Sequence, residues 1–293
     1  MKFIPSLAAL LVAPFLLQAC ASSKVVAPIS LNEQDTARLK AITEQLPPEQ
    51  KARYQYRHPV ETLAFLGIKP GDTVVEILPG EGWYSKILMP YLGPKGRLIG
   101  VDYSVDMWPN FGDFATPEFI AKRQQWPEQW QRDAKGWGGN NGATASAYTF
   151  TTLPENLTGQ VDMVLFVRAL HNLARFESQG QYLTRAMAQT RRVLKPGGYV
   201  GIVQHAIAED KPDAWAKGDG GYLKRSFLVA TMEQQGFELV AESDINHNSL
   251  DNPGAGDTVW RLPPSLRTDE DKKAAMQSIG ESHRVTLLFR KKD

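Results

Sequence analysis

Two glycines stand at a turn between an apolar strand and a helix, in the segment from Glu76 to Ser85. Gly80 and Gly82 would let a ligand approach the backbone, and the helix that follows would aim its first N–H groups at that ligand. Asp102 closes the next apolar run. A carboxylate there can accept hydrogen bonds from both hydroxyls of a ribose, or it can simply cap a helix. The spacing predicts a site for a nucleoside-containing ligand.

Polar residues also follow the two later apolar runs. His171 and Asn172 come soon after the run 161–167, and His205 closes the run that begins at Tyr199. Ligands of doubly wound sheets bind at the carboxyl ends of strands, so these side chains are expected beside a second, reacting molecule. A histidine can act as a base near neutral pH, and each of these can equally be structural. His58, between Arg57 and Pro59, is a further candidate.

Composition excludes several other kinds of site. The chain has 293 residues, with 33 Lys and Arg against 32 Asp and Glu, so no basic excess supports nucleic-acid binding. Its one cysteine rules out an intrachain disulfide and an iron–sulfur cluster. The five histidines show no zinc spacing, so no metal is expected. No Gly-x-Ser-x-Gly elbow supports a serine hydrolase.

The elements that would position these residues alternate between strands and helices. Apolar runs at 74–78, 98–101, 161–167 and 199–203 read as strands buried on both faces, and residues 178–194 follow helical spacing. Helices are predicted at 31–57, broken by Pro47 and Pro48, and at 60–66 and 221–235; strands are predicted at 237–243 and 283–290. The pattern predicts an α/β fold, a doubly wound, Rossmann-like, seven-stranded sheet with an antiparallel last strand, helices on both faces and an N-terminal helical extension.

A tryptophan-rich stretch at 104–147 interrupts this alternation. It contains Trp108, Trp126, Trp130 and Trp137. A loop of this length is commonly a lid or a binding element, whereas an additional helix pair would use the tryptophans for packing. Both interpretations stay open. A polar loop is expected from 244 to about 281. We therefore expect a single domain at 31–293, with N-terminal helices at 31–70 and the insert at 104–147.

The N-terminus has the features of a targeting segment. Residues 1–19 combine a positive start with a short apolar core, and they lead into Leu17-Gln18-Ala19-Cys20. This sequence resembles the lipobox of bacterial lipoproteins, in which cleavage precedes the cysteine and the thiol is acylated. We expect a signal peptide at 1–19, lipidation at Cys20, a tether at 20–30, and a location in the cell envelope, at the outer membrane facing the periplasm. A plain secretory signal is the alternative.

A third signature completes the pattern. Leu194-Lys195-Pro196-Gly197-Gly198 leads from a helix into a strand. With the glycine turn and Asp102, it makes the chain similar, over about residues 48–293, to the class I S-adenosylmethionine-dependent methyltransferases. More narrowly, the chain resembles a bacterial subgroup of predicted methyltransferases, many of them exported. The shared segments are Arg57-His58-Pro59, Pro79 to Ser85, Asp251-Asn252-Pro253 and the final Phe289-Arg290-Lys291.

This resemblance implies S-adenosylmethionine as cofactor and assigns roles to residues. It places Glu76, Gly80, Gly82, Trp83, Tyr84, Asp102 and Arg168 at the cofactor. Glu76 would orient the glycine loop or the cofactor's amino group, and the aromatic rings would face the sulfonium cation unless they are core residues. His58 and Asn172 would contact the methyl acceptor, and His171 or His205 would take its proton. The sequence departs from the family at Leu78, where a glycine is usual, and at Pro79, which removes a backbone donor.

The sequence therefore predicts a lipid-anchored S-adenosylmethionine-dependent methyltransferase that acts on an unidentified small molecule or other acceptor. The methyl donor is made in the cytoplasm, and an exported protein is separated from that supply. This separation favours a function without methyl transfer. The alternative is a non-enzymatic envelope ligand-binding lipoprotein with the same fold. A hydrolase or lyase on this fold is a third hypothesis.

Overall fold

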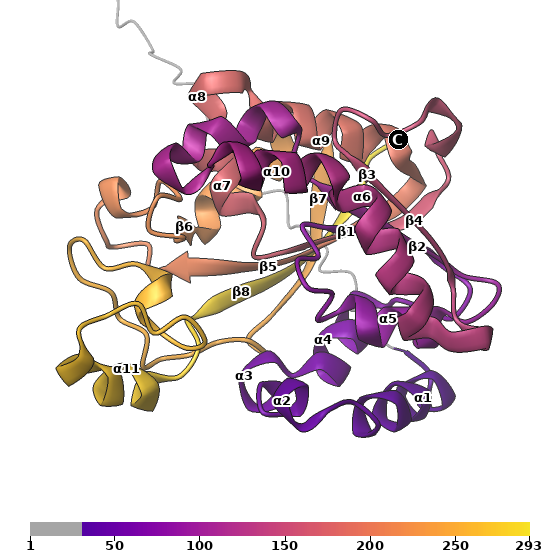
Figure 1. Cartoon of the computed structure of the whole chain (residues 1–293), viewed down its shortest axis with the longest axis horizontal. Helices are drawn as coiled ribbons and strands as arrows, with labels where there is room; N and C mark the ends of the chain where they lie inside the picture. Colours follow the sequence, from indigo (N-terminus) through magenta and orange to yellow (C-terminus); the bar gives the residue numbers. More distant parts are fainter. Residues whose placement is uncertain (1–30) are drawn as a thin grey trace, which may run out of the picture.

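A computed structural model describes residues 31–293 of the chain, and the expected signal peptide, Cys20 and tether lie outside these residues. One mixed sheet has the strand order β3-β2-β1-β4-β5-β8-β7 (Figure 1). Its strands are β1 Thr73–Ile77, β2 Arg97–Asp102, β3 Thr144–Thr149, β4 Val161–Val167, β5 Leu194–Ile207, β7 Phe237–Ser243 and β8 Arg284–Lys291. The two-residue strand β6, Leu223–Lys224, pairs with β5 outside this order.

The sheet confirms the predicted fold class. Strands β3, β2, β1, β4 and β5 are mutually parallel, and β8, the last strand of the chain, runs antiparallel to both β5 and β7. All five residues of β1 are buried, as expected for a strand covered on both faces. The order of connection reverses between β1 and β4, so the carboxyl ends of β1 and β4 flank the point where such sheets bind ligands.

Helices cover both faces of the sheet and enclose two apolar cores. One face carries α1 Glu33–Glu44, α4 Pro59–Leu66, α5 Ser85–Leu92 and α6 Pro117–Gly138. The opposite face carries α7 Leu170–Arg175, α9 Tyr182–Val193 and α10 Arg225–Gln234. Shorter helices are α2 Pro48–Lys51, α3 Tyr54–Arg57, α8 Glu177–Gly180, α11 Lys273–Ile279, η1 Val105–Phe114, η2 Gly139–Asn141, η3 Glu155–Leu157, η4 Asp213–Trp215, η5 Val259–Arg261 and η6 Glu270–Lys272.

The N-terminal helices break where the prolines require it. Asn32 caps α1, since its side chain accepts a hydrogen bond from the Asp35 N–H at 2.7 Å. Pro48 begins α2, and Pro59 begins α4, which ends at Leu66 and is capped by Gly67 with a φ of 71°. Figure 1 shows α1, α2 and α3 together at one end of the molecule, below α4.

The tryptophan-rich stretch is mostly the helical crossover between β2 and β3, rather than a long loop. It forms η1, α6 and η2, and its last residues begin β3. Trp126 and Trp130 are buried, and Trp130 lies against Gly100 of β2, where a side chain would meet the indole ring. The packing interpretation therefore describes these two tryptophans. The polar segment after β7 also contains a helix, α11, that the sequence pattern did not predict.

No helix within residues 31–293 is long and apolar enough to cross a membrane.

Candidate functional site

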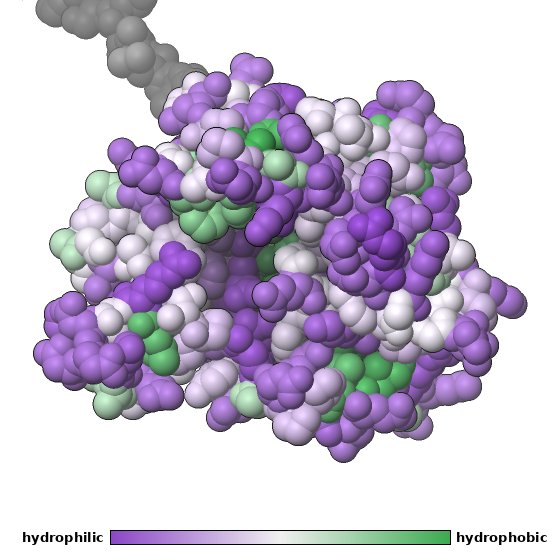
Figure 2. Space-filling view, in the orientation of Figure 1, coloured by the Kyte–Doolittle hydropathy of each residue, from purple (hydrophilic) through white to green (hydrophobic). Residues whose placement is uncertain are grey.

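The carboxyl ends of the strands open into a hollow on one face of the molecule. Figure 2 shows it near the centre of the view, between the side that carries α7 and α10 and the N-terminal helices, with a mostly hydrophilic lining. Most of the residues predicted to act in the site lie at or after the ends of β1, β2, β4 and β5, at this edge of the sheet, whereas His58 lies between α3 and α4. The site has two halves, which we call the donor half (ends of β1 and β2) and the acceptor half (ends of β4 and β5).

The turn after β1 bends without its usual first glycine. Leu78 adopts a φ of 50° and donates its N–H to the Val101 carbonyl of β2 at 2.7 Å. Gly80 has a φ of 60°, and a β-carbon there would meet nothing within 4 Å. Gly82 has a φ of 76°, but a β-carbon on it would overlap the Trp137 ring of α6. Gly80 thus leaves room for a ligand, whereas Gly82 permits helix packing.

Glu76 is a buried carboxylate with no cationic partner within the described residues. It is 2% exposed, and it accepts a hydrogen bond from the Ser85 hydroxyl at 2.6 Å. Burial raises the pKa of Glu76 to about 7, against the smaller opposing effect of Ser85. The Ser85 bond holds the glycine turn to β1, and the carboxylate is ready to pair with a positive group.

Asp102 lies at the end of β2, as predicted, but it is covered. One carboxylate oxygen accepts the Tyr103 N–H at 2.8 Å, and the other pairs with Arg123 of α6. The Arg123 guanidinium lies 4.9 Å from the Trp108 ring centre and 5.4 Å from that of Trp126. Burial raises the pKa of Asp102 to about 6, although Arg123 opposes the shift. Arg123, which sequence reasoning missed, therefore occupies the place expected for ribose hydroxyls.

Trp83 and Tyr84 contact protein groups. The Arg57 guanidinium lies 4.7 Å from the Trp83 ring centre, and Tyr84 meets Trp83 edge to face at 4.7 Å. Tyr84 is buried, and its hydroxyl donates to the Arg57 carbonyl at 3.4 Å. The cation over Trp83 is therefore an arginine of the chain itself, and these two side chains join the donor half to the N-terminal helices.

Arg168 repeats, after β4, the backbone geometry of Leu78 after β1. It has a φ of 58°, and its N–H donates to the Val203 carbonyl of β5 at 2.7 Å. Five described non-glycine residues have positive φ, and three of them, His58, Leu78 and Arg168, lie in or beside the site. Such strained conformations concentrate at functional positions. The Arg168 side chain makes no hydrogen bond or ion pair with residues 31–293.

The two predicted catalytic histidines lie together and are buried. Their ring centres are 5.7 Å apart. His171 Nδ1 lies 3.4 Å from the Gln204 amide nitrogen, which also donates to the Gly221 carbonyl, and His205 Nδ1 lies 2.5 Å from the Ser282 hydroxyl. Burial, followed by nearby positive charge, lowers the pKa of His171 to about 4 and that of His205 well below its usual value. Both imidazoles are neutral at pH 7, and the site disfavours the imidazolium that a general base would become.

The two predicted acceptor contacts differ in position. Asn172 is buried in the acceptor half, and its side-chain oxygen has no partner within residues 31–293. His58 forms the junction of α3 and α4 in a left-handed conformation, where its N–H bonds to the Tyr54 carbonyl. Asn172 therefore has a buried acceptor atom without a donor among the described residues, whereas the backbone of His58 shapes the helix junction.

Sequence reasoning missed a buried charge cluster beside these residues. Glu281, in the loop before β8, accepts hydrogen bonds from Arg57 at 3.1 Å and Arg284 at 2.9 Å, and it also pairs with Arg53. We call these four residues and Arg168 the arginine cluster. Burial opposes ionisation of Glu281, but the charges of Arg284, Arg57 and Arg53 outweigh it and lower its pKa to about 2. The segment Arg57-His58-Pro59 was the only feature of the sequence that could have indicated this cluster.

The Asp251-Asn252-Pro253 segment has a structural explanation. Asp251 accepts hydrogen bonds from Tyr222 at 2.9 Å, from Arg261 at 2.8 Å and from the His283 N–H at 2.9 Å. It fastens the long segment between β7 and β8 to Tyr222, which directly precedes β6. Within residues 31–293, no three metal-ligating side chains of the types His, Cys, Asp and Glu lie together as a metal site.

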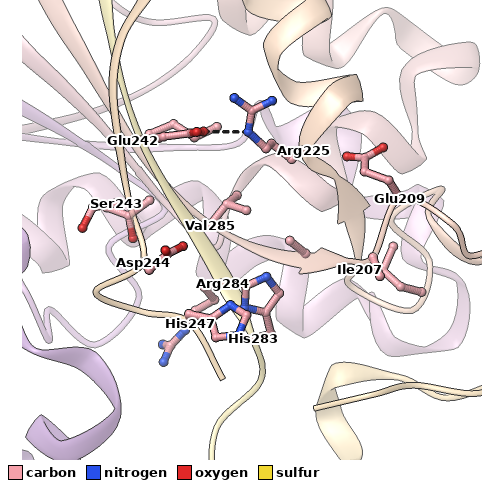
Figure 3. Close-up of a pocket in the computed structure, with 14 residues that line it drawn as sticks. Ile207, Glu209, Arg225, Glu242, Ser243, Asp244, His247, His283, Arg284 and Val285 are labelled. Carbon is pink, nitrogen blue, oxygen red and sulfur yellow. Dashed lines mark hydrogen bonds and ion pairs between the residues drawn. The ribbon is translucent and has the colours of Figure 1, made fainter. Parts of the chain in front are cut away.

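A separate cavity of about 360 Å³ lies between the ends of β5, β7 and β8 (Figure 3). Arg225 and Glu242 form an ion pair of 2.6 Å across it, and the rings of His247 and His283 lie 4.5 Å apart in its wall. None of the predicted site residues lines this cavity, although Arg284 does. It adjoins the acceptor half at the end of β5 and is separate from the donor half at the ends of β1 and β2.

The sequence of the chain is similar to that of a known protein over a short segment. No protein-family profile matches it. Ribosomal RNA small subunit methyltransferase H of Flavobacterium psychrophilum is 42% identical over 50 residues, which are 17% of this chain and 17% of that protein.

Solved structures resemble the chain at low sequence identity. A SAM-dependent methyltransferase from Aquifex aeolicus is 14% identical with a TM-score of 0.47, and the alignment covers 87% of this chain and 97% of the other. The arsenic(III) S-adenosylmethionine methyltransferase CrArsM of Chlamydomonas reinhardtii is 15% identical, with coverages of 87% and 73% and a TM-score of 0.44. The [4+2]-cyclase SpnF is 14% identical, with coverages of 92% and 99% and a TM-score of 0.48.

Proposed function

We propose that the chain is an S-adenosylmethionine-dependent methyltransferase. The observation that carries the proposal is the donor half, in which Gly80 leaves open space beside β1 while Glu76 and Asp102 present carboxylates at the ends of neighbouring strands. These residues fit the cofactor, since Asp102 can accept from ribose hydroxyls and Glu76 can pair with its amino group. The cofactor, when bound, supplies an electrophilic methyl group.

The chain's own residues would contribute mainly by positioning. Arg123 has to leave Asp102 before the carboxylate can accept ribose hydroxyls, so α6 and η1 would adjust as the cofactor binds. Asn172, with its free side-chain oxygen, and the neutral His171 and His205 would hold the acceptor by hydrogen bonds. Orientation of two reactants in this way can supply about 7–11 kcal/mol of the barrier in well-aligned systems.

Calorimetric titration of the purified protein with S-adenosylmethionine and S-adenosylhomocysteine tests the proposal. We expect both to bind with one site per chain. Failure of both to bind would exclude the methyltransferase function.

A second candidate is a binding protein that keeps the fold without the reaction. The pairing of Asp102 with Arg123 favours it, because the carboxylate already has a partner. The same titration separates the two hypotheses, since the binding protein would give no heat with either compound.

We further propose that the protein is a lipid-anchored component of the cell envelope. The supporting observation is the sequence Leu17-Gln18-Ala19-Cys20, which holds the chain's one cysteine. One acyl chain binds a membrane only marginally, so a lasting anchor would need more than one. Cys20→Ser should abolish labelling by a radioactive fatty acid and release the protein from the membrane fraction. A variant that stays labelled and membrane-bound would contradict the anchor.

A further inference from the structure

The arginine cluster carries more positive charge than its own carboxylate balances. Arg53, Arg57 and Arg284 contact a single acid, Glu281, and Arg168 adds a fourth positive charge that acts on it from the end of β4. Glu281 is already shared among three of these arginines through direct contacts. Arg168, the partly buried arginine without a partner among the described residues, is therefore left to pair with an anionic ligand.

Two groups in the cluster have no hydrogen-bond partner within residues 31–293. Arg168 makes no hydrogen bond or ion pair with the described residues, and its left-handed backbone holds the side chain at the end of β4. The Nε atom of Arg284 is buried without a partner within residues 31–293. Burial, and next the charge of Arg57, lowers the pKa of Arg168 to about 9, so it stays protonated at pH 7.

The cluster lies on the acceptor side of the sheet. Arg284 begins β8 directly opposite His205 of β5, and Arg168 follows β4. Asp102 lies at the end of β2, on the far side of β1. Val167, directly before Arg168, pairs with Val203 of β5, and Arg284 pairs with His205, so the two arginines lie on either side of the end of β5 that carries His205.

We propose that the arginine cluster binds an anionic group, a carboxylate or a phosphate, of the methyl acceptor. Guanidinium groups match both anions through paired N–H donors. The assignment rests on the proposed function and narrows the acceptor to an anionic molecule. It also moves Arg168 from the cofactor, where the family resemblance placed it, to the acceptor.

The arginine cluster could instead bind the carboxylate in the methionine part of the cofactor. Binding experiments distinguish this carboxylate from an anionic group of the acceptor. Sodium phosphate and sodium acetate are titrated at constant ionic strength into the protein with and without S-adenosylhomocysteine. We expect phosphate or acetate to bind both in the presence and in the absence of S-adenosylhomocysteine. Arg168→Gln should weaken its binding about tenfold, and Arg168→Lys less. Arg185→Gln, which removes an exposed charge on α9, should have no effect. Absence of anion binding to the parent, or equal binding to Arg168→Gln, would overturn the proposal.

S-adenosylhomocysteine and 5′-methylthioadenosine, which lacks the amino-acid part, provide the second arm. We expect Arg168→Gln to bind both as the parent does. A selective loss of S-adenosylhomocysteine binding would assign the arginine to the cofactor's carboxylate and overturn the acceptor assignment. If the parent binds neither nucleoside but binds the anion, the proposed function fails while the anion site stands.

Folding of the variant gives a third readout. Because Arg168 is a partly buried cation without a partner, Arg168→Gln should melt at the same temperature as the parent or higher when no ligand is present. A melting temperature several degrees lower would make Arg168 a structural residue and would contradict the proposal.

Discussion

The two halves of the site each bury a carboxylate, but in opposite electrostatic environments. Glu76, in the donor half, has only the Ser85 hydroxyl for a partner, and its pKa rises to about 7. Glu281, in the acceptor half, has three arginines, and its pKa falls to about 2. Besides Glu76, the donor half holds Asp102, which already pairs with Arg123, so the donor half has one carboxylate more than it has cations. The acceptor half has a surplus of positive charge. A positively charged ligand group would balance the donor half, and an anionic ligand group would balance the acceptor half.

The largest effect is expected from Glu281→Gln. The change leaves three arginines without their shared carboxylate, and breaking a buried ion pair in this way costs about 3–5 kcal/mol. Urea denaturation at pH 7 measures the loss. Glu49→Gln, which changes an exposed side chain on α2, is the matched control. Equal stabilities of the variant and the parent would show that Glu281 does not hold the arginines together.

Glu76→Gln should stabilise the folded protein at neutral and higher pH, whereas Glu281→Gln should destabilise it. The pKa of Glu76 rises from 4.5 in the unfolded chain to about 7 in the folded protein. The protonated carboxyl therefore favours folding fully below pH 4.5, and this contribution is lost as the pH rises through 7. A neutral amide keeps the Ser85 hydrogen bond and should stabilise the protein at pH 8 on the order of 3 kcal/mol relative to the parent.

The pH dependence separates this effect from simple repacking. Denaturation of Glu76→Gln and the parent between pH 4.5 and 8 should show a stability difference that grows with pH. A constant difference would mean that Glu76 does not titrate in this range. Glu281 should behave inversely, since its contribution is present above pH 4.5 and lost as the pH falls through about 2.

Asp102→Asn tests the ligand-binding role of the second donor-half carboxylate. It removes charge-assisted hydrogen bonds to ribose hydroxyls, worth about 1.5–3 kcal/mol each, so affinity for S-adenosylhomocysteine should fall at least about tenfold. Arg123→Gln removes the partner that covers Asp102 and should bind S-adenosylhomocysteine at least as tightly as the parent. If Arg123→Gln loses binding and Asp102→Asn keeps it, the ligand contact belongs to the arginine.

The smallest effects concern the glycine turn. Gly82→Ala should cost about 1–3 kcal/mol of stability because the new methyl group meets Trp137, and Trp137→Ala should partly rescue it. Gly80→Ala has room for the methyl group, so only its left-handed backbone opposes the change, at about 1 kcal/mol. Thermal unfolding of the two variants measures the difference. Equal losses would mean that packing against Trp137 does not decide the role of Gly82.

The sequence predicted the strands of the sheet well because buried parallel strands are continuous apolar runs. The strand β4 matches its run at 161–167, and β7 matches 237–243. The edge strand β3 was missed, since Thr144–Thr149 pairs on one side only and contains small polar residues. The sequence does not decide between a helix and a long loop for α6, because Pro127 and the tryptophans obscure its apolar face.

The donor half was more predictable than the acceptor half for a physical reason. Gly80 and Asp102 lie within one strand–helix–strand unit, where sequence spacing determines position. The arginine cluster joins α3, the end of β4 and the start of β8, and contacts such as Arg53 to Glu281 link residues 228 positions apart. Arg123 could not be assigned because its partner depends on how α6 lies across β2.

Titration of S-adenosylhomocysteine into the parent, Asp102→Asn and Arg168→Gln tests the division of the site most directly. We predict one site per chain in the parent, a loss of at least about tenfold in affinity for Asp102→Asn, and unchanged affinity for Arg168→Gln. No binding to the parent, or equal losses in the two variants, would contradict a donor half that functions separately from the arginine cluster.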